Sequence, residues 1–220
     1  MSATRIQPQI IPTQALFNKE NLCVPEYQRP YKWTAKNVNQ LIDDITHHRK
    51  KAAYRLGTIV FYQDEQQRLN VVDGQQRTVT LLLIAMAIQT NEGRLKEELN
   101  KAKVKTLRST WFANLQFKNL ISLNNIRDNY REIERRVADF DVDTVLFFYE
   151  RCELVEVILH DVSEAFQFFD SQNARGKDLE PHDLLKAFHL REMAEVSTEQ
   201  ERMRAVSDWE GLDTDELKNV

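Results

Sequence analysis

The chain contains one long stretch without glycine or proline, and that stretch limits the folds open to it. Neither residue occurs between Arg94 and Arg175, whereas four of the five prolines lie in the first 30 residues. A segment of this length without a breaker is most simply a series of helices. With 42% hydrophobic residues among 220, the chain can bury the core of one large or two small domains, which excludes disordered and collagen-like classes.

Charge is distributed unevenly along the chain. Residues 1–80 contain 11 Lys and Arg against 7 Asp and Glu, whereas residues 81–220 contain 19 against 27. The basic front is compatible with a local anion site, while the net charge of −4 argues against a protein that coats nucleic acid.

Cysteine content indicates a reducing compartment, and hydropathy argues against a membrane protein. Cys23 and Cys152 are too few for a disulfide framework or a cysteine zinc site. The longest apolar stretch, Val79 to Ile88, is far too short to span a bilayer, and the N-terminus has no signal-peptide pattern. We expect a cytoplasmic protein with no membrane partner.

Local patterns predict the order of elements. Residues 1–25 are expected to be extended, with a short strand at 22–24, followed by a helix from the N-cap Thr34 to about residue 51, strands at 55–62 and 69–72 joined as a hairpin, and a helix at 75–89. Helices are then expected at 94–103, 111–120, 122–138, 141–151, 163–171 and 181–194, with one strand at 152–160 returning to the sheet. The prediction is an α/β (α+β) fold, with a small mixed sheet and flanking helices in residues 1–92. Residues 93–220 are expected to form a mainly helical region with one returning strand near 152–160, packed with the first region as one unit.

The segment from Val71 to Thr78 (VVDGQQRT) has the strongest chemical pattern, namely a strand, a tight turn and a helix start. A helix N-terminus offers free N–H groups and the positive end of the helix dipole, which suits phosphate. Gly74 would let a ligand approach the backbone, and the planar guanidinium of Arg77 matches phosphate oxygens. The segment is therefore a candidate anion site.

The other polar residues of this turn extend the chemistry. Asp73 could hold a magnesium ion through water or orient an attacking water, and Gln75 and Gln76 could position a water or contact a base or sugar. A structural alternative is a capping box, with Asp73 as the N-cap and Gln76 three residues later. Spacing alone does not decide between the two.

A second segment, Tyr27 to Trp33 (YQRPYKW), interleaves aromatic and basic residues on a stretch that Pro30 keeps extended. Aromatic rings stack on bases and basic groups meet phosphates. The alternative is that Tyr31 and Trp33 pack into the core while the basic residues are solvated or paired, and the segment taken alone favours it.

A third feature is the loop from Asn173 to Gly176 (NARG), where Gly176 would end a helix. Asn173 and Arg175 could reach a phosphate from this loop. Alternatively, Arg175 interacts with the carbonyl groups at the helix end.

The motifs occur in a specific order: V-P-x-Y-Q-R-P-Y-x-W, L-G-T-I-V, V-V-D-G-Q-Q-R-T and F-x-x-x-N-x-R-G-x-x-L-x-x-x-D-L-L-K. In this order they resemble the N-terminal domain of GmrSD-type modification-dependent restriction proteins over roughly residues 8–195. That domain is similar to the ParB/sulfiredoxin fold. In ParB-like proteins a glycine-led polar motif ending in arginine binds nucleotide phosphates at the same strand-to-helix turn.

The resemblance implies roles for individual residues. It implies that a nucleoside triphosphate binds to Gly74, Arg77, Thr78, Asn173 and Arg175, and that Asp73, Gln75, Gln76 and Arg77 support its hydrolysis. Magnesium would be held mainly through the phosphates, near Asp73. It also implies that Tyr27, Gln28, Arg29, Tyr31 and Lys32 lie beside this pocket and sense modified double-stranded DNA.

The resemblance also bears on partners. In the family, a separate C-terminal His–Asn–His-type domain usually cuts the DNA, and no such motif is present in the 220 residues. Either the natural protein continues into a nuclease domain, or a separate subunit supplies the cutting, or this member lacks it. A homo-oligomer is compatible with the sequence. Because there is no Walker-type lysine, hydrolysis would be slow and dependent on a partner.

These inferences lead to one main expectation about function. The chain is expected to be a nucleoside-triphosphate-binding and hydrolysing regulatory domain that controls DNA restriction. Two alternatives stay open. One is a non-catalytic module that recognises modified DNA through the basic front, and the other is a structural interaction domain.

Overall fold

The computed structural model describes residues 7–24, 30–91, 117 and 120–161, together with the single positions 164, 198, 201, 204, 205 and 208. The helices predicted at 94–103, 111–120, 163–171 and 181–194 fall almost entirely outside these residues.

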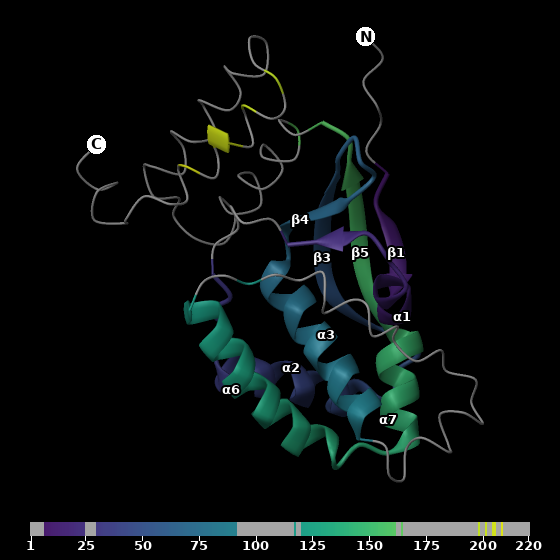
Figure 1. Ribbon diagram of the computed structural model, residues 1–220. Coiled ribbons are helices and arrows are strands. Elements are labelled where there is room, and N and C mark those ends of the chain that lie inside the picture. Colours follow the sequence, from purple (N-terminus) through teal and green to yellow (C-terminus); the bar gives the residue numbers. More distant parts are fainter. Residues whose placement is uncertain are drawn as a thin grey trace, which may run out of the picture.

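A five-stranded mixed sheet forms the frame of the described part (Figure 1). Its strands lie in the order β1 (Gln9–Pro12), β5 (Cys152–Leu159), β3 (Tyr54–Gln63), β4 (Leu69–Asp73) and β2 (Leu22–Cys23). The central pair β3 and β5 is parallel, β3 and β4 form an antiparallel hairpin, β1 is antiparallel to β5, and β2 is parallel to β4. The predicted α/β fold, the hairpin and the returning strand are confirmed.

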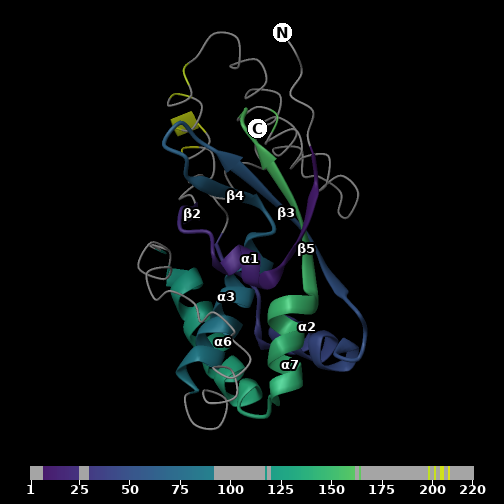
Figure 2. The ribbon, with the colours of Figure 1, turned by 90° about the vertical axis from the view of Figure 1, so that its right-hand side faces the viewer.

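Parallel neighbouring strands such as β3 and β5 need a long crossover connection, and the segment that joins them in this chain contains helices. The described helices are α1 (Thr13–Phe17), α2 (Ala35–His48), α3 (Gln75–Thr90), α6 (Leu120–Val137) and α7 (Val142–Leu146), followed by the π-helical turn η1 (Phe147–Arg151). Figures 1 and 2 show α2, α3, α6 and α7 grouped at one end of the sheet. The expectation that residues 1–25 are extended was wrong at α1, whose Leu16 and Phe17 are buried in the core.

Apolar patterning explains how the helices sit. The predicted face of α2, formed by Val38, Leu41, Ile42 and Ile45, is buried, and Thr34 is the N-cap as expected. In α3 every residue from Thr78 to Ala85 is buried, and a helix buried on all sides must lie inside the fold. Contacts between α3 and α6 and between α2 and α6 complete the packing. No helix among the described residues combines the length and apolarity needed to cross a membrane.

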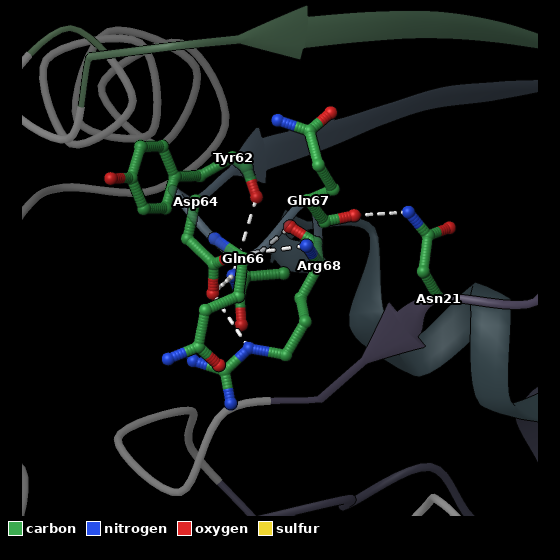
Figure 3. A network of polar contacts seen from close by, with 7 residues as sticks. Asn21, Tyr62, Asp64, Gln66, Gln67 and Arg68 are labelled. Carbon is green, nitrogen blue, oxygen red and sulfur yellow. Dashed lines mark hydrogen bonds and ion pairs between the residues drawn. The ribbon is translucent and has the colours of Figure 1, made fainter.

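The turn of the β3–β4 hairpin is organised around the buried carboxylate of Asp64 (Figure 3). Its Oδ1 accepts hydrogen bonds from the N–H groups of Gln66 at 3.0 Å and Arg68 at 2.9 Å. Its Oδ2 accepts from Arg68 Nε at 2.7 Å and from Asn70 Nδ2 at 3.1 Å. These bonds fix the hairpin register, and with it the residue at which β4 ends.

Candidate functional site

The candidate site lies where β4 ends at Asp73 and α3 begins at Gln75, as predicted. Gly74 between them has a φ of +83°, a left-handed conformation that favours glycine. A Cβ atom at Gly74 would lie 3.0 Å from the backbone oxygen of Thr58 and 3.3 Å from the Cα of Ile59. Glycine is therefore required for the close approach of α3 to β3, a reason that the sequence did not reveal.

Two irregularities of strand register border this turn. Against β5, the pairing of β3 steps from Arg55 to Gly57 and leaves out Leu56. In the hairpin, Val60 pairs with Asp73 while Phe61 pairs with Val71, so that Val72 is the extra residue. Such bulges re-aim neighbouring side chains and are frequent beside functional sites.

The capping-box alternative for this helix is wrong. The N-cap is Gly74, no side chain caps the helix at that position, and the first α-helical hydrogen bond runs from the N–H of Thr78 to the carbonyl of Gly74 at 2.9 Å. The N–H groups of residues 75–77 precede this bond and have no acceptor within the helix. No capping side chain therefore occupies these N–H groups, which are the donors that a phosphate would need.

The Arg77 side chain lies along the edge of β3. Its Nη1 donates to the backbone oxygen of Thr58 at 3.1 Å, and a Cβ atom at Gly57 would lie 2.8 Å from its Cζ and Nη1. Gly57 has a φ of +121°. We therefore add Gly57 to the site. A glycine inside a strand marks a bulge or a close approach, and that was the signal available in the sequence.

The electrostatics of Arg77 are those of a cation with spare binding capacity. Burial lowers the pKa of the guanidinium, and the negative charge of Asp73 partly counteracts this. A guanidinium has five N–H donors. Within the described part of the chain, Thr58 is its one hydrogen-bond acceptor and no carboxylate lies within ion-pair distance.

Two polar side chains in the first turns of α3 are buried and have an oxygen without a hydrogen-bond partner in the described part of the chain. Gln75 is 5% exposed and Thr78 is 0% exposed. Among the described residues, neither Gln75 Oε1 nor Thr78 Oγ1 has a hydrogen-bond partner. Buried polar groups are normally satisfied, so these two atoms indicate a place that a water or a ligand completes.

The side chain of Gln76 points to the segment at residues 30–33. Its Oε1 accepts from the N–H of Lys32 at 2.7 Å and of Trp33 at 3.1 Å, while its Nε2 donates to the carbonyl of Pro30 at 3.1 Å. Its amide is therefore engaged by protein, unlike the amide oxygen of Gln75.

In the segment at residues 30–33, the structural alternative holds for the aromatic residues. Tyr31 is 0% exposed, and Trp33 is partly buried against the core, whereas Lys32 is exposed. Burial raises the pKa of Tyr31, and hydrogen bonds with Thr80 and Asn129 partly offset this effect. The proposed role of Tyr31 and Lys32 in sensing DNA remains a prediction. In this conformation the role of Tyr31 would have to be indirect, because its side chain has no exposed surface.

The remaining predicted site residues lie outside the described part of the chain. They are Tyr27, Gln28, Arg29, Asn173 and Arg175. Asp73 is the single acidic candidate for a metal at the turn, and no group of three metal-ligating side chains occurs among the described residues. One carboxylate fits magnesium that is held mainly by substrate phosphates, which is the usual arrangement for this ion.

The comparison with protein families gives one match. The chain matches the family model of the GmrSD restriction endonuclease N-terminal domain over residues 13–190. This range contains the whole β3–β4–α3 site and the segment at residues 30–33. No curated protein matches the chain. The match covers most of the 220 residues and indicates a restriction or phage-defence protein. The chain therefore belongs to the family of the GmrSD restriction endonuclease N-terminal domain.

Proposed function

We propose that this chain is a nucleoside-triphosphate-binding regulatory domain of a DNA restriction system, and that the phosphates bind at the start of α3. One observation carries the proposal. The partly buried, cationic Arg77 lies in the first turn of a helix whose N–H groups are not covered by a capping side chain. In the described part of the chain its guanidinium has a single acceptor.

Removing a charged group from water costs free energy. A guanidinium removed from water and left with unused donors is unfavourable until an anion approaches. A phosphate oxygen would accept charge-assisted hydrogen bonds from the guanidinium of Arg77, each contributing about 1.5–3 kcal/mol. The dipole of α3 acts in the same direction, and the absence of a side chain at Gly57 leaves room for the guanidinium beside β3.

The neighbouring residues suit the rest of a nucleotide. Among the described residues Thr78 Oγ1 and Gln75 Oε1 are buried polar atoms without a partner. The Thr78 hydroxyl can donate to a phosphate oxygen, and the Gln75 amide oxygen can accept from a sugar hydroxyl. Magnesium bound with the triphosphate would neutralise charge that develops on the phosphates. Asp73 would then hold the ion through water or orient the attacking water, and Arg77 would stabilise negative charge on the phosphates. Gln76 contributes to the site only through its backbone, because its side chain holds the 30–33 segment.

Calorimetry tests this proposal. We expect GTP, ATP, CTP or UTP to bind to the 220-residue chain in the presence of Mg²⁺. Arg77→Ala should weaken binding at least tenfold, which corresponds to about 1.4 kcal/mol. The affinity of Arg77→Lys should lie between those of the wild type and Arg77→Ala, since lysine keeps the charge and lacks the planar guanidinium. Arg131→Ala on α6, which removes an exposed arginine, is the matched control and should bind like the wild type. The proposal fails if no triphosphate binds, or if both Arg77 variants bind as tightly as the wild type.

A further inference from the structure

The segment at residues 30–33 has no regular secondary structure, yet its backbone is held almost completely by side chains. The carbonyl of Pro30 and the N–H groups of Lys32 and Trp33 are bonded by Gln76. Side chains of α6 bond three further groups: Ser122 Oγ accepts from the N–H of Tyr31 at 2.9 Å, Asn125 Nδ2 donates to its carbonyl at 2.9 Å, and Asn129 Nδ2 donates to the carbonyl of Trp33 at 2.7 Å. Buried backbone groups need such partners, so these side chains determine where the segment lies.

Gln76 is the largest contributor from α3. A single amide satisfies three backbone groups, with its oxygen accepting twice and its nitrogen donating once. The main chain of Gln76 takes part as well, because its carbonyl accepts from Thr80 Oγ1 at 2.8 Å. The same Thr80 hydroxyl lies 2.8 Å from the hydroxyl of Tyr31. The first turn of α3 is therefore linked to the segment directly through the Gln76 side chain, and indirectly through the Gln76 carbonyl and Thr80.

Gln76 lies in the sequence between two residues that are candidates for binding the ligand. Within the described part of the chain, Gln75 precedes it with an unpartnered amide oxygen, and Arg77 follows it with a guanidinium that has spare donors. A phosphate bound to the N–H groups of residues 75–77 would act on the same peptide units from which the Gln76 side chain extends. Order imposed on this turn by a ligand would thus be transmitted to Lys32 and Trp33.

We propose that Gln76 is a positioning residue that couples occupancy of the phosphate site to the placement of residues 30–33. The inference rests on the function proposed above and deepens it. Coupling between two sites is reciprocal, so whatever stabilises the held conformation of residues 30–33 should tighten phosphate binding by the same factor.

Amide hydrogen exchange measures the first half of the proposal without any ligand. Gln76→Ala should speed exchange at Lys32 and Trp33 at least tenfold. Gln76→Glu keeps the acceptor and loses the donor to Pro30, so it should retain part of the protection. Gln75→Ala is the matched control: it removes the same kind of side chain one residue away, whose amide oxygen has no hydrogen-bond partner among the described residues, and it should leave both amides unchanged. Equal protection in the wild type and in Gln76→Ala would overturn the proposal.

The second half uses the triphosphate that binds best in calorimetry, with Mg²⁺. In the wild type it should slow exchange at Lys32 and Trp33 several-fold, and in Gln76→Ala the ligand should bind without this effect. A chain with Trp111→Phe and Trp209→Phe leaves Trp33 as the single tryptophan, and its emission should respond to the ligand unless Gln76 is replaced. This fluorescence readout also serves for Gln76→Glu if Gln76→Ala does not fold.

The possible outcomes separate the two proposals. If a triphosphate binds the wild type while the exchange and emission of residues 32 and 33 stay unchanged, the coupling is wrong and the proposed function stands. If the effect persists in Gln76→Ala, the coupling is again wrong. If no triphosphate binds at all, both proposals fall.

Discussion

The guanidinium of Arg77 lies directly against the backbone of Gly57. A Cβ atom at Gly57 would come within 2.8 Å of Cζ and Nη1 of Arg77. The hydrogen bond from Nη1 to Thr58 fixes the guanidinium beside the part of β3 that extends past its pairing with β4, which begins at Val60. A strand glycine and a helix arginine, 20 residues apart in the sequence, thus form one unit of the candidate site.

Replacing Gly57 with alanine should therefore affect both stability and the site. The new methyl group would displace Arg77, and the φ of +121° is strained for any residue with a Cβ. We expect the free energy of unfolding to fall by about 1–3 kcal/mol. Triphosphate binding should weaken as well. Urea titration and calorimetry on the same protein measure the two effects.

A double-mutant cycle isolates the contact in this prediction. In an Arg77→Ala background the added methyl group meets no guanidinium, so Gly57→Ala should then cost only the backbone strain. Residues in contact couple by about 0.5–3 kcal/mol. Additive losses of stability would show that Gly57 does not act through Arg77.

Tyr31→Phe tests whether the buried hydroxyl stabilises the contact between the 30–33 segment and the helices. The change removes the hydrogen bonds with Thr80 at 2.8 Å and with Asn129 at 3.0 Å. We expect a loss of about 1 kcal/mol or slightly more in urea unfolding, because both partners keep one other bond. Tyr130→Phe on α6 is the control. Its hydroxyl meets Thr90 at 3.1 Å in an exposed position, so the change should cost much less. Equal costs for the two variants would contradict the prediction.

Asp64 at the β3–β4 turn should make stability depend on acid pH. Burial raises the pKa of this carboxyl, but hydrogen bonds from Arg68 and Asn70 and the charge of Arg68 outweigh burial, so the pKa is lowered. The ionised group then favours folding above its unfolded pKa of about 4, and this contribution is lost as the pH falls through the lower folded value.

Asp64→Asn should remove that contribution. We expect the variant to be less stable at pH 7 by about 1.5–3 kcal/mol, the range for hydrogen bonds to a charged group. The difference from the wild type should shrink as the pH falls below about 4. Urea unfolding at several pH values between 7 and 3 checks this. Asp128→Asn, which alters an exposed carboxylate, should leave the pH profile unchanged.

The contacts explain which features the sequence could predict. The helix α2 follows from periodicity within a few residues, since Val38, Leu41, Ile42 and Ile45 form one buried face. The strand β3 follows from its β-branched and aromatic residues. The turn at Asp73–Gly74 follows from local chemistry. Because a local pattern determines each of these elements, reading a short window of residues is sufficient.

Other features depend on partners far away in the sequence. The helix α1 has five residues, which is too few to be stable alone. Tertiary contacts hold it in place: the ring centroids of Phe17 and Phe148 are 5.6 Å apart, and Thr13 Oγ1 donates a hydrogen bond to the carbonyl of Phe148. In the site, the sequence indicated the importance of Gln76 but suggested a cap or a water ligand. Its actual partners, Pro30, Lys32 and Trp33, are more than 40 residues away.

Thr78 and Thr80 provide a matched pair for the final prediction, because both are buried threonines on α3 with opposite hydrogen bonding. Thr78 Oγ1 has no partner among the described residues, whereas Thr80 Oγ1 bonds the carbonyl of Gln76 and the hydroxyl of Tyr31. Valine has nearly the same shape as threonine without the hydroxyl. Thr80→Val should cost about 1–2 kcal/mol of stability, since it removes two buried hydrogen bonds, including the one to the Tyr31 hydroxyl.

Thr78→Val should be neutral or slightly stabilising without ligand, since replacing an unsatisfied buried hydroxyl removes a desolvation cost. The same variant should bind triphosphate more weakly, because the hydroxyl that awaits a partner is gone. Urea unfolding and calorimetry on both variants separate these effects. A loss of stability in Thr78→Val as large as in Thr80→Val would mean that Thr78 already has a partner in the folded protein. In that case its hydroxyl would be structural and would not be available to a ligand.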